Sequence, residues 1–152
     1  MNDTLHLPPH PGAPVACDMR GAADTPDQRL GEYQRLFQRA LASRERRPEG
    51  VVLRFRADPG VRAAVESLAR REAACCPFLD YHVETANGEV IWTTTNPLAG
   101  EKRAAVDVYL DAFHDLSDHV DPDITGLFER LAARGVEIDA AAGDRLELRP
   151  RS

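Results

Sequence analysis

Asn87-Gly88 is the strongest folding signal in this sequence. Apolar and polar side chains alternate before it, over residues 81–85, and again after it, over residues 90–95. Asn-Gly accepts the positive φ angles of a tight turn whose twist matches that of two antiparallel strands. The sequence therefore predicts a β-hairpin here, with Trp92 in the core rather than on a binding surface.

Two helices are predicted ahead of this hairpin. Thr25-Pro26-Asp27-Gln28 combines an N-cap, a proline in the first turn and a capping-box partner, and the helix that follows is predicted to run to about Arg44. The next helix is predicted to begin at Asp58-Pro59. It should end at or just before Cys76, because Pro77 disfavours helical backbone at the residue that precedes it.

Further strands and helices follow from the same kind of pattern. Val51–Ala57 alternates like a half-buried strand, and residues 136–139 with 145–148 suggest a second hairpin. Apolar residues at helical spacing predict a helix over residues 102–116 and another from Asp121-Pro122 to about residue 135.

This order of strands and helices predicts an α+β fold. We expect a single domain with a mostly antiparallel sheet, helices packed on one face, and a central part that could be ferredoxin-like. Residues 1–24, rich in proline, glycine and alanine, are predicted to be a flexible segment that can dock through Val15–Met19. Residues 25–118 would form the core that holds the adjacent cysteines, and residues 119–152 would add a helix and a hairpin to the same domain.

Composition and charge narrow the range of partners. The formal net charge of −6 argues against nonspecific nucleic-acid binding. No apolar run approaches a membrane span and the N-terminus lacks signal-peptide features, so we expect no membrane association and a cytoplasmic location. The chain has no nucleotide or flavin signature. Its three cysteines, without an export signal, predict reduced thiols rather than disulfides.

The chemical signal lies in Glu72-Ala73-Ala74-Cys75-Cys76-Pro77. Glu72 falls on the apolar stripe of its predicted helix, so its carboxyl must be hydrogen-bonded, protonated or in a polar cavity. The two thiols follow one turn later. A disulfide between adjacent cysteines is strained, and the negative end of a helix disfavours a free thiolate. A thiophilic metal would overcome the unfavourable effect of the helix end on a thiolate, because the charge of the metal drives the thiols to deprotonate.

Cys75 and Cys76 are therefore the predicted metal ligands. Docking of the segment around Cys17 would add a third thiol, and three thiols suit soft ions such as mercury, arsenite or copper(I), with zinc as a further candidate. Cys17 could equally be a small apolar docking residue. His82 is a candidate nitrogen ligand, although a single histidine on a strand is more often a surface or hydrogen-bonded residue.

The run Glu72-x-x-Cys75-Cys76-Pro77-Phe78, with a strand before and after it, resembles small bacterial proteins that carry an E-x-x-C-C-P-F motif. Some of those proteins occur with regulators of the mercury-resistance type. The resemblance covers about residues 15–116 and implies a role in heavy-metal resistance. Glu72, Cys75 and Cys76 are the positions that match the motif.

Three functional classes remain open. A binding protein would sequester or sense a soft metal or metalloid at the thiols. An enzyme, such as an organometal lyase, would hold its substrate on the thiols while Glu72 acts as the catalytic acid or base. An interaction protein would use the cysteines only for packing and would bind a protein partner at its C-terminal hairpin. Leu127–Val136, with the return strand after Gly143, is similar to the helix-hairpin docking modules of peptide synthetase assembly lines.

Overall fold

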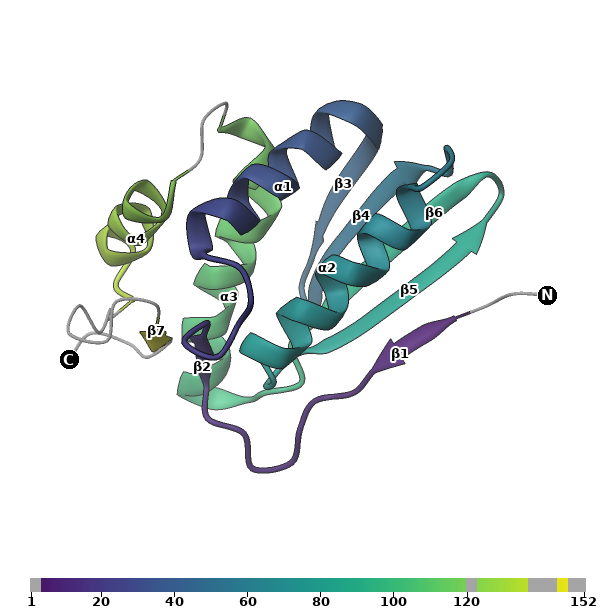
Figure 1. Ribbon diagram of the computed structural model, residues 1–152. Coiled ribbons are helices and arrows are strands. Elements are labelled where there is room, and N and C mark those ends of the chain that lie inside the picture. Colours follow the sequence, from purple (N-terminus) through teal and green to yellow (C-terminus); the bar gives the residue numbers. More distant parts are fainter. Residues whose placement is uncertain (1–3, 120–122, 137–144, 148–152) are drawn as a thin grey trace.

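The computed structural model describes residues 4–119, 123–136 and 145–147 (Figure 1). A five-stranded antiparallel sheet has the strand order β1-β5-β6-β4-β3. Its strands are β1 (Leu5–Leu7), β3 (Leu41–Arg47), β4 (Gly50–Arg56), β5 (Asp80–Ala86) and β6 (Glu89–Thr95). A separate two-stranded sheet pairs β2 (Ala16–Asp18) with β7 (Arg145–Glu147). The helices are α1 (Pro26–Ala40), α2 (Val61–Cys75), α3 (Gly100–His114) and α4 (Ile124–Ala133), with a 3₁₀ turn at Asp115–Asp118.

Helices α1, α2 and α3 pack on one face of the larger sheet. Trp92 of β6 stacks on Tyr33 of α1 at 6.0 Å between ring centroids and meets Phe113 of α3 edge-on at 5.6 Å. Trp92 pairs directly with Val83 of β5, so Tyr81, two residues before Val83, points to this same face. The Tyr81 hydroxyl reaches the end of α2. The predicted α+β class, with helices on one face of a mostly antiparallel sheet, is confirmed.

The connection through α2 places the two adjacent cysteines. β4, α2 and β5 form a split β-α-β unit, because β6 lies between β4 and β5 in the sheet. This is the local arrangement expected of a ferredoxin-like central part. It brings the last turn of α2 to the start of β5, beside β2 of the N-terminal segment (Figure 1).

The strongest local sequence signals are confirmed. In the capping box of α1, the backbone N–H of Gln28 donates to the Thr25 hydroxyl at 3.1 Å, and the backbone N–H of Thr25 donates to Oε1 of Gln28 at 3.0 Å. Asn87 and Gly88 have φ angles of 53° and 77°, the positive values that their tight turn requires. Trp92 is buried in the core, as expected.

Three predicted helix boundaries are wrong. α1 ends at Ala40 and is followed directly by β3. The sequence did not predict this edge strand because most of its residues are charged. α2 begins at Val61 rather than at Asp58-Pro59, because Gly60, with φ of 85°, takes the N-cap position. The cap of α4 is Asp123, since its side chain accepts from the Gly126 amide at 2.6 Å; residues 120–122 lie outside the described residues.

Both ends of the chain contribute strands. The segment predicted to be flexible contains β1, which extends the edge of the larger sheet, and β2. Of the predicted C-terminal hairpin, residues 137–144 lie outside the described residues, whereas β7 pairs with β2. None of the helices in the described part of the chain is long and apolar enough to cross a membrane.

Candidate functional site

The adjacent cysteines meet at a break in the backbone. Cys75 is the last residue of α2, and Cys76, with φ of −122° and ψ of 68°, has left the helix before Pro77. In a regular helix successive side chains point about 100° apart. Here the two Sγ atoms lie 3.5 Å from each other.

Cys17 joins this pair through a disulfide, which corrects the prediction of reduced thiols. Its Sγ atom is bonded to that of Cys76 at 2.16 Å, and Cys75 is the free, buried cysteine. That prediction rested on the cysteine count and on an expected cellular location, and neither of these determines how close two cysteines lie in the fold. Pairing of β2 with β7 beside the end of α2 brings the Cα atoms of Cys17 and Cys76 to 4.4 Å, within the range of a disulfide.

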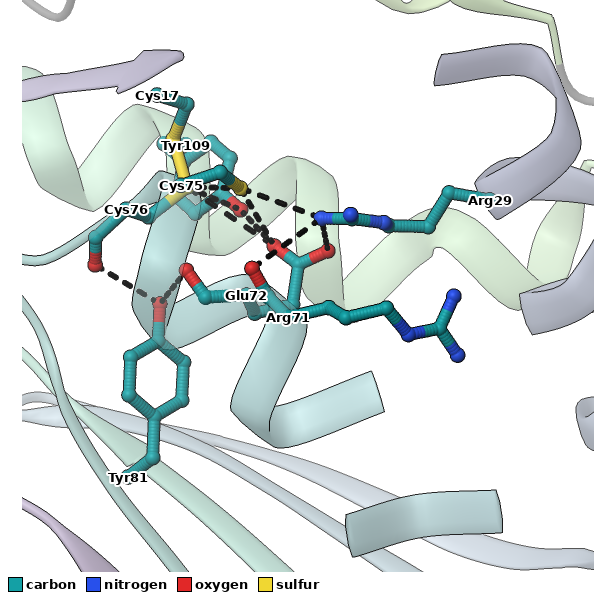
Figure 2. Close-up of a disulfide and its surroundings, with 8 residues drawn as sticks. All are labelled: Cys17, Arg29, Arg71, Glu72, Cys75, Cys76, Tyr81 and Tyr109. Atoms are coloured by element: carbon teal, nitrogen blue, oxygen red, sulfur yellow. Dashed lines mark hydrogen bonds and ion pairs between the residues drawn. A yellow bond between two sulfur atoms is a disulfide. The ribbon is translucent and has the colours of Figure 1, made fainter. Parts of the chain in front are cut away.

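Glu72 lies one helical turn before the sulfurs, and its carboxyl contacts both the sulfurs and the Arg29 guanidinium (Figure 2). Its Oε2 atom is 4.0 Å from the Sγ of Cys75 and 3.9 Å from that of Cys76. The Tyr109 hydroxyl lies 3.4 Å from the same oxygen. Glu72 is only 7% exposed. Burial raises the pKa of its carboxyl, and the nearby charge of Arg29 only partly opposes that rise.

Arg29 is a site residue that the sequence prediction missed. It is 3% exposed, and its Nη1 atom lies 3.3 Å from Glu72 Oε1 and 3.3 Å from Cys75 Sγ. Asp24 fixes the other side of the guanidinium at 2.7 and 2.9 Å. The hydrogen bond from Arg29 lowers the pKa of Asp24 to about 2. Arg29 lies four residues before Tyr33 on the buried stripe of α1. A charged residue on an apolar stripe could have identified Arg29 as a site residue from the sequence.

The Cys75 thiol is held in its protonated form. Burial raises its pKa, the negative charge of Glu72 raises it further, and Arg29 partly opposes both. The site therefore presents a neutral thiol and a carboxyl with a raised pKa, rather than a free thiolate. Deprotonation of Cys75 needs a further positive charge close to the sulfur.

A largely apolar cavity of about 90 Å³ opens beside the sulfurs. Glu72, Cys75, Cys76 and Arg29 line its polar end. Tyr33 also lines it. The remaining walls come from α1, α3, the 3₁₀ turn after α3, α4 and the segment after β2, and include Met19, Leu30, Phe113, Leu116, Leu127 and Phe128.

The candidate ligand atoms of Glu72, Cys75 and Cys76 all lie within 4.8 Å of one another. A possible metal-ligand group therefore exists at the predicted cysteine pair. Cys17 reaches the pair, as a disulfide partner of Cys76. The structure does not bring His82 there: His82 alternates with Tyr81 along β5 and faces away from α2, beside His6 and Asp80.

Comparison with known proteins finds no match among protein-family models, curated proteins or solved structures. The resemblance to proteins with the E-x-x-C-C-P-F motif stays a prediction, and the geometry of the site carries the functional argument.

Proposed function

We propose that the reduced protein binds one soft, thiophilic metal or metalloid ion through Cys75 and Cys76, with Cys17 as a third thiolate. One observation carries this proposal: three sulfur atoms from two separate segments meet in one buried place. Cys76 Sγ is bonded to Cys17 Sγ and lies 3.5 Å from Cys75 Sγ. Three thiolates are ligands suited to mercury(II), arsenite and copper(I).

The electrostatics of the site favour a bound cation over a bare thiolate. Burial and Glu72 keep the Cys75 thiol protonated, so the ion must supply the charge that drives its deprotonation. A divalent ion with three thiolates would carry one net negative charge. The guanidinium of Arg29, 3.3 Å from Cys75 Sγ, is placed to compensate that charge.

Binding should depend on the redox state of the protein. In the disulfide form Cys17 and Cys76 are joined to each other and cannot act as thiolates, which leaves Cys75 as the one free thiol. Reduction would release two further sulfurs beside Cys75. Metal binding can therefore be compared between the oxidised and reduced forms of the same protein, which have the same amino-acid sequence.

The test is an anaerobic ultraviolet titration with mercury(II) and, separately, arsenite. The reduced wild-type protein should develop a thiolate charge-transfer band that saturates at one equivalent. The band should be weakened in both Cys75→Ser and Cys17→Ser, because each variant keeps only two of the three thiols, while the oxidised wild-type protein gives no comparable band. If the reduced wild-type protein shows no saturable band, the cysteines are packing residues and the proposal fails.

A second candidate function, cleavage of a carbon–metal bond, is favoured by the position of Glu72. Its carboxyl lies about equally far from both sulfurs, at the end of an apolar cavity that could hold an organic group. One thiolate would hold the organometal and a second would attack the metal. The carbon–metal bond would break, the Glu72 proton would pass to carbon, and the hydrocarbon would leave with the metal held by both sulfurs.

Glu72→Gln separates this enzyme from a simple binding protein. The variant keeps all three cysteines, so it should still bind mercury(II), but it has no acidic proton to donate. Incubation of the reduced protein with phenylmercury, followed by assay for benzene, should give product with the wild-type protein and none with Glu72→Gln. No benzene from the wild-type protein would exclude the lyase and leave metal binding as the function.

A further inference from the structure

Two histidines and an aspartate gather on the face of the sheet that the helices leave uncovered. His6 of β1 pairs directly with His82 of β5 across the two strands. Asp80 stands two residues before His82 on β5, and side chains at this spacing share one face of a sheet. Tyr81, between them, points to the opposite face, where its hydroxyl contacts the end of α2.

Their ring nitrogens converge on one carboxylate. His6 Nε2 lies 2.7 Å from Asp80 Oδ1, and His82 Nε2 lies 3.2 Å from Asp80 Oδ2. The imidazole rings stack with centroids 4.1 Å apart and planes 19° from parallel. One nitrogen from each histidine and one oxygen of Asp80 lie within 4.8 Å of one another. Two strands thus present three ligand atoms to one small volume.

This set of donors differs in chemistry from the thiol site. Imidazole nitrogen suits zinc, nickel and copper(II), and a carboxylate oxygen completes a common first-row metal set. The side chains of His6 and His82 are 48% and 43% exposed, whereas that of Asp80 is 20% exposed. The carboxylate is thus the sheltered partner, and the open side of the group leaves room for water ligands.

We propose that His6, Asp80 and His82 form a divalent metal site, separate from the cysteines, that joins β1 to β5. The ion would replace the two imidazole–carboxylate contacts with bonds to Nε2 of each histidine and to Asp80. It would also tie the N-terminal strand, only three residues long, to the edge of the sheet. The site needs no thiol and does not depend on the redox state of the cysteines.

The test uses the untagged, disulfide-bonded Cys75→Ser protein, which has no free thiol to compete for the metal. Calorimetric titration with nickel(II), and separately with zinc(II), should show one saturable site. Substitution of a direct ligand by His6→Ala, His82→Ala or Asp80→Asn should weaken binding by roughly tenfold or more, since even partners outside the ligand set contribute that much.

His10→Ala is the matched control, because it removes another exposed histidine from the same N-terminal segment. It should leave the affinity unchanged, and circular dichroism should show that all four variants remain folded. Absence of saturable binding, or equal affinity in His6→Ala and the parent protein, would overturn the proposal. Neither outcome bears on the thiol site, which is absent from the protein used.

Discussion

The protonation of Glu72 depends on a balance between burial and its polar neighbours. Burial raises the pKa of its carboxyl, and the rise is opposed first by Arg29 and then by hydrogen bonds from Tyr33 and Tyr109. Arg29, however, also donates to Asp24, which is ionised and lies closer to the guanidinium than Glu72 does. The positive charge is therefore shared, and Glu72 can keep a proton beside the sulfurs above the pH at which an exposed carboxyl would lose it.

The proton on the Glu72 carboxyl should be detectable in the pH dependence of the free energy of unfolding. Because the pKa of Glu72 is raised in the folded state, its contribution to stability is present below its unfolded pKa, about 4.3, and is lost as pH rises through the folded value. Glu72→Gln removes that titration. Urea denaturation of the oxidised proteins should therefore show Glu72→Gln gaining stability relative to wild type as pH rises from about 4.

Glu66 provides the control for this measurement, since its carboxyl is on the same helix but 30% exposed and pairs with Arg62 on the surface. Glu66→Gln should not reproduce the rise in relative stability with pH. A difference between Glu72→Gln and wild type that stays constant with pH would mean that the pKa of Glu72 is the same in the folded and unfolded states. The proton donor of the lyase hypothesis would then be lost.

Helices and strands were predictable where a few neighbouring residues decide the conformation. Asn87-Gly88 and the Thr25 capping box act within four residues, and both are found as predicted. β3 was missed because its stability comes from pairing with β4, not from its own charged sequence. β1 is a similar case, since its place at the sheet edge depends on β5, more than seventy residues later.

The start of β4 depends on a glycine for a steric reason that the sequence pattern does not reveal. A Cβ atom on Gly50 would lie 1.9 Å from the Thr94 carbonyl oxygen of β6, a backbone atom that cannot move without disturbing the strand pair. Gly50→Ala should lower the free energy of unfolding by about 2–3 kcal/mol. Gly21→Ala, which meets no atom within 4 Å, should change it by less than about 0.5 kcal/mol in the same urea denaturation. Equal effects would contradict the steric explanation.

The candidate site could be predicted only in part, because it is assembled across the whole molecule. Glu72, Cys75 and Cys76 are near neighbours in sequence, and helical spacing was enough to group them. The bond from Cys17 to Cys76 spans 59 residues, and Arg29 reaches Cys75 from 46 residues away. Neither contact follows from periodicity, since each depends on how the N-terminal segment and α1 pack against α2.

The disulfide makes the N-terminal segment part of the fold, so its loss should be measurable in the stability of the whole chain. Closing a loop of 59 residues is expected to contribute about 4 kcal/mol, chiefly by restricting the unfolded chain. Reduction should therefore lower the midpoint of urea denaturation of the wild-type protein. Because Cys75→Ser keeps the disulfide, its oxidised and reduced forms should differ by a similar amount.

A soft metal should restore the stability that the protein loses when its disulfide is reduced. An ion held by Cys17, Cys75 and Cys76 closes the same loop as the disulfide, and it stabilises the folded state in proportion to the logarithm of its concentration over its dissociation constant. One equivalent of mercury(II) should return the reduced wild-type protein toward the oxidised midpoint. Cys17→Ser can bind the ion at the adjacent pair but cannot close the loop, so it should recover less. Full recovery in Cys17→Ser would mean that the N-terminal thiol takes no part in metal binding and that the site consists of the adjacent pair.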